Sequence, residues 1–312
     1  MRESTQVVWF SPPHPVRGTL LAALGGTCWG FSGTAAQLLT ADMGVPVAWI
    51  TPVRLCMAAV VLLAVCALKC PDKMTALVRD CATMGRVALF ALLGVLFTQF
   101  SYLSAIAYTN SGTGTMMERL GLLLIMGYTC VRARRLPRGR EALGVAVALL
   151  AVFLMATQGD PSTLSISAAG FGWGLMAALA MAFYTLLPAK PLAKYGSLVV
   201  PAFAMAIAGV AALGLTRPWT MEVNVTPQVI AVMAAMVLVG TVGAYLMYLQ
   251  GIADAGPVRA SLAGCMEPVS AMVISALWLH TSFSGFDVVA LVLILAMVVL
   301  VTVPSKPQGQ SG

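Results

Sequence analysis

The chain has 312 residues, of which 60% are apolar and only 9% are charged, with a net charge of +7. A soluble domain carries about 25% Asp, Glu, Lys and Arg, so this composition excludes a water-soluble enzyme, a disordered chain, a coiled coil and a secreted disulfide scaffold. It favours an all-α, polytopic membrane protein, in agreement with a mean hydropathy of +0.92.

The first 16 residues are polar and interrupted by prolines, so we expect a tail that is neither a signal peptide nor a membrane span. Crossing a bilayer core takes roughly 20 apolar residues. Because backbone groups in lipid must be satisfied within the segment, apolar runs of this length are expected to be helices. Ten such runs follow in chain order, at residues 18–40, 46–68, 86–108, 111–131, 140–157, 171–189, 198–216, 226–250, 257–279 and 285–303.

The basic residues predict the orientation of these ten helices. With the N-terminus in the cytoplasm, the outer loops hold only Arg217, and Arg54, Arg119 and Arg259 fall within helices. The other 14 of the 18 basic residues lie in inner segments: Arg2, Arg17, Lys69, Lys73, Arg79, Arg86, Arg132, Arg134, Arg135, Arg138, Arg140, Lys190, Lys194 and Lys306. The positive-inside rule therefore predicts that both termini are cytoplasmic. Anionic lipid explains the basic cluster at 132–140, and no nucleic-acid partner is expected.

The two halves of the chain match each other without gaps at an offset of 146 residues. The matched pairs include Gly94 with Gly240, Tyr102 with Tyr248, Leu103 with Leu249, Ile106 with Ile252, Ala107 with Ala253, Met126 with Met272 and Glu141 with Asp287. We predict two five-helix repeats, 17–158 and 159–304, between cytoplasmic tails at 1–16 and 305–312. Because five is odd, the second repeat is inverted in the membrane, an arrangement that favours alternating access.

Three stretches resemble the EamA family of the drug/metabolite transporter superfamily: Gly256–Val269, Asn110–Thr115 and Arg132–Pro137. Arg54 and the pair Trp29-Gly30 also fit this family. The resemblance covers nearly the whole chain. It implies a ten-helix transporter of small metabolites, often an exporter, with a central cavity lined mainly by helices 1, 3, 4, 6, 8 and 9.

The sequence departs from the family pattern in three places. Gly121-Leu122 stand where the first repeat usually has a pair such as Ser-Pro, and Glu118-Arg119 stand where a neutral polar residue such as Gln is frequent. The usual acidic residue after the ninth helix is absent, since the chain reads Trp278-Leu279-His280-Thr281. The family's substrates are therefore not carried over to this chain.

Charged side chains within apolar helices mark candidate functional positions, because each costs on the order of 2.5–3.5 kcal/mol to insert. Glu118, in the fourth helix, is expected to be a cavity carboxylate that binds an amine or carries a coupling proton, or else to pair with Arg54 or Arg119. Glu267 is expected near the midplane of the ninth helix. The resemblance includes its pair with Pro268, which favours gating over substrate contact.

Two further sets of charges are predicted nearer the membrane surfaces. Arg54, in the first turns of the second helix, is expected to reach the interface or to pair with an acid. Asp254 and Arg259 flank the inner junction of the eighth and ninth helices, where they are expected to pair with each other or with lipid headgroups.

Aromatic and polar side chains complete the predicted substrate cavity. A set of Tyr and Trp rings suits planar or apolar solutes and can offer cation–π contacts, although each ring alone is as well explained by packing. The cavity set is Trp29, Gln99, Tyr102, Thr115, Glu118, Tyr184, Tyr245 and Tyr248, and the gating or coupling set is Glu118, Glu267, Pro268, Arg54 and Arg119.

These features predict a secondary transporter of a small organic metabolite, an amino acid or related amine moved outward across the cell membrane, with possible proton coupling. The alternative within transport is uncoupled exchange, and channels or lipid-acting enzymes are the alternatives of another class. No catalytic residue, cofactor or metal is expected, because the only histidines are His14 and His280 and the cysteines form no CxxC motif. A monomer or weak dimer is expected.

Overall fold

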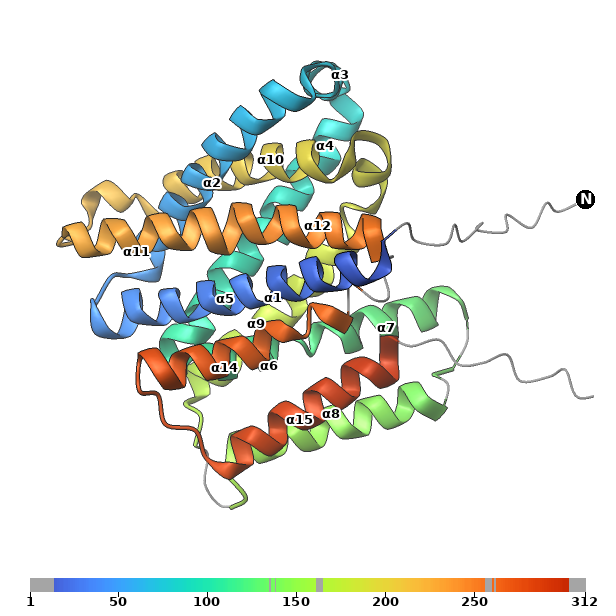
Figure 1. Cartoon of the computed structure of the whole chain (residues 1–312), viewed down its shortest axis with the longest axis vertical. Helices are drawn as coiled ribbons and strands as arrows, with labels where there is room; N and C mark the ends of the chain where they lie inside the picture. Colours follow the sequence, from blue (N-terminus) through green and yellow to red (C-terminus); the bar gives the residue numbers. More distant parts are fainter. Residues whose placement is uncertain are drawn as a thin grey trace, which may run out of the picture.

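The computed structural model describes residues 14–134, 136–137, 139–160, 165–255, 260 and 262–302. Across these ranges the chain is built of helices joined by short connections and contains no strand (Figure 1). The all-α class predicted from composition is therefore confirmed for the described part of the chain.

The N-terminal half contributes eight α-helices and two π-helical segments. They are α1 (Pro15–Gln37), η1 (Leu38–Asp42), α2 (Val47–Lys69), α3 (Pro71–Arg79), α4 (Cys81–Leu89), η2 (Phe90–Leu96), α5 (Phe97–Tyr108), α6 (Ser111–Glu118), α7 (Gly121–Arg132) and α8 (Gly139–Thr157).

The C-terminal half follows the same order of long and interrupted helices. It comprises α9 (Ala168–Leu186), α10 (Ala189–Thr216), the 3₁₀ turn η3 (Pro218–Thr220), α11 (Pro227–Val237), the π-helical η4 (Leu238–Gly243), α12 (Ala244–Ala255), α14 (Met266–Trp278) and α15 (Gly285–Thr302).

Six helical segments are long and apolar enough to cross a membrane by length and composition. They are Val47–Lys69, Cys81–Tyr108, Gly139–Thr157, Ala168–Leu186, Ala189–Thr220 and Pro227–Tyr248. Two shorter apolar helices, Met266–Trp278 and Gly285–Val301, accompany them. The chain is therefore a multi-pass membrane protein.

The segment expected to be a loop between the second and third helices is largely helical. α3 covers Pro71–Arg79 and α4 begins at Cys81, five residues before the predicted start at 86. Proline at the first position of α3 and the Asp80 side chain, which accepts a hydrogen bond from the Thr83 N–H, set these helix starts. The apolar run alone missed them because both helices begin in polar sequence.

A π-helical segment interrupts the third long helix of each half at the same register. η2 contains Gly94 and η4 contains Gly240, the pair related by the offset of 146 residues. Such segments are rare, and they are frequently found at functional sites. The repeat seen in the sequence thus has a counterpart in backbone geometry.

Helices of one half pack mainly against helices of the other half. α1 lies against α12 and α14, and reciprocally α9 lies against α5, α6 and α7. The remaining principal contacts join α2 with α10 and α8 with α15, at opposite edges of the bundle (Figure 1). Exchanging the two halves leaves this pattern unchanged, as expected for two related repeats that face each other.

Glycines allow α1 to approach its neighbours closely. A Cβ at Gly26 would lie 2.9 Å from the Gly264 carbonyl oxygen, and one at Gly30 would lie 2.6 Å from the Ala271 nitrogen. Small residues of this kind let helix backbones meet in a membrane bundle. α1 is consequently held at the centre of the protein by its backbone as well as by its side chains.

We expect Gly30→Ala to lower the thermal unfolding midpoint in detergent. The added methyl group overpacks the α1–α14 contact, at a cost of about 1–3 kcal/mol, which outweighs a gain of about 1 kcal/mol in helix propensity. Gly172→Ala in α9 is the matched control, because nothing lies within 4 Å of a Cβ there. Equal midpoints for the two variants would contradict the close approach.

Asp80 joins the two halves at the end of the bundle where α2 meets α3. Its carboxylate accepts hydrogen bonds from Lys194 Nζ at 2.6 Å, from the Tyr195 hydroxyl at 2.9 Å and from the Thr83 hydroxyl at 2.7 Å. The Lys194 bond, followed by those from Thr83 and Tyr195, lowers the pKa of the Asp80 carboxyl below its ordinary value. The charged form of Asp80 therefore favours the folded protein.

We expect Asp80→Asn to lower the unfolding midpoint at pH 7 and to lose this effect in acid. A lowered pKa in the folded state stabilises the protein above the ordinary carboxyl pKa of about 4, and this stabilisation is lost as pH falls below it. The difference between wild type and variant should be constant from about pH 5 to 8 and shrink below about pH 4. Asp72→Asn, at an exposed position of α3, is the control, and a pH-independent difference would contradict the assignment.

Candidate functional site

Two helix breaks meet near the centre of the bundle. Arg119 and Leu120 separate α6 from α7, and Gly264 and Cys265 precede α14. At both breaks the backbone forms i→i+3 hydrogen bonds, from Leu120 N to Met117 O at 3.1 Å and from Cys265 N to Leu262 O at 3.1 Å. Under the 146-residue offset, Arg119 corresponds to Cys265, so the breaks are related by the repeat.

The prediction of continuous fourth and ninth helices was wrong at these breaks. Glu267 is therefore in the first turn of α14 and does not lie within a continuous helix. Pro268 fits this place because the first turn of a helix needs no backbone donor at that position. The Gly264 carbonyl accepts the Glu267 N–H at 3.1 Å.

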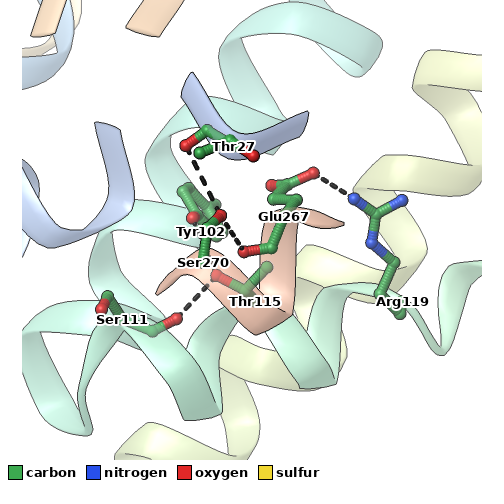
Figure 2. A network of polar contacts seen from close by, with 7 residues as sticks. All are labelled: Thr27, Tyr102, Ser111, Thr115, Arg119, Glu267 and Ser270. Atoms are coloured by element: carbon green, nitrogen blue, oxygen red, sulfur yellow. Dashed lines mark hydrogen bonds and ion pairs between the residues drawn. The ribbon is translucent and has the colours of Figure 1, made fainter. Parts of the chain in front are cut away.

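An ion pair between Arg119 and Glu267 joins the two breaks (Figure 2). Glu267 is 8% exposed. Next to it, the Ser270 hydroxyl donates to the Glu267 carbonyl at 3.0 Å and to the Thr27 carbonyl of α1 at 3.4 Å. The pair thus links α6–α7 to α14 beside α1.

Arg54 of α2 is 5% exposed and does not reach the interface, so that alternative for it was wrong. Its Nη2 donates to the Ser32 hydroxyl of α1 at 2.9 Å, and its Nε donates to the Thr241 hydroxyl of η4 at 3.3 Å. Neither partner is an acid. The sequence had not singled out Ser32 or Thr241, which are visible only as single hydroxyl residues within apolar runs.

Glu118, at the end of α6, is 8% exposed, and in the described part of the chain its carboxylate has no hydrogen-bond partner. The charged groups that act on it electrostatically are Glu267, Arg119 and Arg54. The expected ion pair with either arginine is not formed. One turn earlier, the Thr115 hydroxyl contacts the Tyr102 hydroxyl at 3.0 Å.

The predicted aromatic set divides into two groups. Trp29 of α1 packs against Tyr245 and Tyr248 of α12, with ring centroids 5.8 and 4.9 Å apart. Tyr184 lies apart from them and packs against Phe90 of η2, with centroids 5.4 Å apart. The Gln99 side-chain oxygen is buried, and the described residues offer it no hydrogen-bond partner, which fits a place beside a polar site.

Polar contacts also link the helices at both ends of the bundle. Asp254 pairs with Arg17, with Nε and Oδ2 3.3 Å apart, whereas its predicted partner Arg259 lies outside the described residues. At the opposite end, Gln37 donates to the Thr281 hydroxyl at 2.9 Å and accepts the Ser111 N–H at 2.8 Å. Gln37 therefore links α1, α6 and the connection after α14.

Two pockets lie away from this centre. A polar pocket of about 250 Å³ lies where α5 ends and α6 begins, and an apolar groove of about 440 Å³ lies along α8 and α9. Asp287 lines the polar pocket and accepts bonds from Gln158 at 2.8 Å and from the Ser284 N–H at 2.8 Å.

We expect Arg119→Gln to lower the unfolding midpoint strongly, because it leaves the Glu267 charge buried without its partner, at a cost of about 3–5 kcal/mol. The double variant Arg119→Gln/Glu267→Gln should recover most of the loss, since it removes both charges. Arg132→Gln, at the exposed end of α7, is the control. Additive losses in the double variant would argue against the pair.

Comparisons with known proteins agree with this architecture. The sequence profile of the EamA-like transporter family matches the chain twice, at residues 16–157 and 168–303. The chain is 28% identical over 295 residues to an uncharacterised inner membrane transporter, YicL, of Salmonella typhimurium, across 95% of this chain and 98% of that protein.

The fold also resembles the crystal structure of another protein, with a TM-score of 0.61. The two chains are 18% identical, and the match covers 91% of this chain and 96% of that chain. At this identity the likeness concerns the fold alone. The two family matches cover most of the sequence, one in each half. The chain therefore belongs to the EamA-like transporter family.

Proposed function

We propose that this transporter is a secondary carrier of a small organic metabolite that works by alternating access. The observation that carries the proposal is the buried Glu118 carboxylate, which has no hydrogen-bond partner among the described residues and lies where two repeat-related helix breaks meet. Interrupted helices that meet near the centre of a repeat protein are typical of substrate sites in secondary transporters.

We further propose ten membrane spans in two inverted repeats, 17–158 and 159–304, with cytoplasmic tails at 1–16 and 305–312. Only six segments meet the length and hydropathy criteria, and three of the other four spans build the polar centre. α1 is rich in glycine and hydroxyl residues, while α6–α7 and α14 are shortened by the breaks. The fourth, α15, is apolar but short. The reciprocal packing of the two halves supports the same arrangement.

The charge distribution supports an orientation with both termini in the cytoplasm. Lys69 ends α2 and Arg132 ends α7, and these ends lie on the same side as the start of α1 if successive spans alternate in direction. We place the protein in the inner membrane, which is what the name of the Salmonella relative says of that protein. A monomer or weak dimer, without a nucleic-acid partner, fits this placement.

For the substrate we propose an amino acid or a related amine, moved outward. A carboxylate in a water-poor site attracts an ammonium group, and rings close to it add cation–π attraction. The proposed cavity comprises Trp29, Gln99, Tyr102, Thr115, Glu118, Tyr184, Tyr245 and Tyr248. The proposed gating and coupling residues are Glu118, Glu267, Pro268, Arg54 and Arg119.

Glu118 is also the proposed carrier of a coupling proton, because a carboxylate that meets substrate and proton in turn can couple their movements. The competing function is uncoupled exchange, in which substrate moves without a proton. A channel would conduct without saturating, and a lipid-acting enzyme would turn over lipid in the absence of any transported solute.

The test is counterflow in proteoliposomes, with radiolabelled amino acids and monoamines offered one at a time, with and without an imposed pH gradient. We expect saturable transport that the gradient accelerates, and we expect Glu118→Gln to abolish the acceleration. Glu222→Gln, at an exposed position before α11, is the matched control. Gradient-independent, saturable transport by wild type would favour uncoupled exchange, and non-saturating flux would favour a channel.

A further inference from the structure

The buried charges of the polar centre form a balanced but incompletely paired set. Arg54 and Arg119 carry two positive charges, and Glu118 and Glu267 can supply two negative charges when both carboxyl groups are ionised. Arg119 and Glu267 neutralise each other in an ion pair. Arg54 and Glu118 act on each other electrostatically, yet neither has an ion-pair partner in the described part of the chain.

Unpaired charges at this depth are expensive, since each costs several kcal/mol unless a partner or water is present. Arg54 is 5% exposed and Glu118 is 8% exposed, so little water reaches either side chain in this state. Within the described residues Arg54 thus has a charge without a counter-charge, and Glu118 has a carboxyl group without a polar partner. Both side chains are suited to bind groups of a solute.

The hydrogen bonds of Arg54 leave one edge of its guanidinium available. Nε is used by Thr241 and one Nη2 hydrogen by Ser32. In the described part of the chain no hydrogen bond uses Nη1, and Nη2 has a second hydrogen, so Arg54 keeps donors with which to bind a carboxylate. Ser32 and Thr241 are neutral, so they orient this guanidinium without neutralising its charge.

We propose that Arg54 is a second recognition residue, which binds an anionic group of the substrate while Glu118 binds its cationic group. This inference rests on the proposed transport function and narrows its substrate. The site takes a solute of zero net charge that carries both a carboxylate and an ammonium group. A monoamine would form an ion pair with Glu118 but would leave Arg54 without an anionic partner.

A purely structural role for Arg54 makes a different prediction. As a tie between α1 and η4 through Ser32 and Thr241, Arg54 would contribute to the stability of the protein and to the binding of every solute alike. Recognition instead changes the preference among solutes within one variant. Comparing related solutes on the same variant therefore separates the two roles, whatever the variant does to stability.

The test measures binding to the detergent-solubilised full chain, by thermal shift confirmed by calorimetry. The probes are the twenty standard L-amino acids and, for the one that stabilises most, its amide, which lacks the carboxylate, and its N-acetyl derivative, which lacks the ammonium group. We expect the amino acid to bind about ten to a hundred times more tightly than either derivative, the range for one lost hydrogen bond to a charged group.

Two variants should then give crossed results. In Arg54→Gln the amino acid should bind no more tightly than its amide but still more tightly than its N-acetyl derivative. In Glu118→Gln the amino acid should bind no more tightly than its N-acetyl derivative but still more tightly than its amide. Arg217→Gln, in the connection after α10, should leave both preferences unchanged. Equal effects on all three probes would assign Arg54 a structural role and overturn the proposal.

If a variant fails to fold, measurements on the wild type alone still test whether Arg54 binds the substrate carboxylate. An amide that binds as tightly as its parent amino acid overturns the role of Arg54, and so does the absence of binding by all twenty amino acids. If monoamines are transported and amino acids are not, this inference fails and the proposed transport function stands. If no solute shows saturable transport, the proposed function itself fails.

Discussion

The arrangement of this protein depends on the cost of placing ionised groups in an apolar bundle. Arg119 and Glu267 meet this cost by pairing across the two halves, at the point where each half interrupts a helix. The interruptions matter because non-helical backbone within a membrane is tolerated only where protein buries it or where it lines a water-filled cavity. The ion pair and the two breaks therefore form one unit, and the surrounding helices pack around it.

The close packing of α1 follows from the same requirement. Short contacts at Gly26 and Gly30 bring its backbone against the break before α14, and hydroxyl residues on α1 and α14 supply polar partners to a region that water scarcely enters. In a membrane, where burial of apolar surface does not drive helices together, such contacts and hydrogen bonds hold the bundle. The π-helical segments η2 and η4 are a second local change of backbone geometry that occurs in both halves.

Contacts at the two ends of the bundle differ in character from the centre. Asp80 binds Lys194 and Tyr195 at one end, and Gln37 binds Ser111 and Thr281 at the other. The Asp80 set lies near solvent, where water can replace its hydrogen bonds at small cost, whereas Gln37 is 9% exposed and Ser111 is fully buried. At the centre, by contrast, neither Arg54 nor Glu118 has an ion-pair partner within the residues that the structure describes. A transporter that opens to either side must break the contacts at each end of the bundle in turn. Its centre must be stabilised when the substrate binds.

The sequence by itself determined the all-α membrane class, the family, the internal repeat and the short list of intramembrane charges, because composition, register and rare charges are properties of local sequence. Only the tertiary structure decided which side chains the intramembrane charged residues contact. Glu118 and Arg119 are neighbours in the chain, yet Arg119 pairs with Glu267, whereas Glu118 has no ion-pair partner among the described residues. Arg54 was expected to reach the interface or to pair with an acid, but it donates hydrogen bonds to Ser32 and Thr241, which no sequence pattern had marked. Such pairings depend on which helix faces lie opposite each other and on where helices break, and helical periodicity along one segment contains neither.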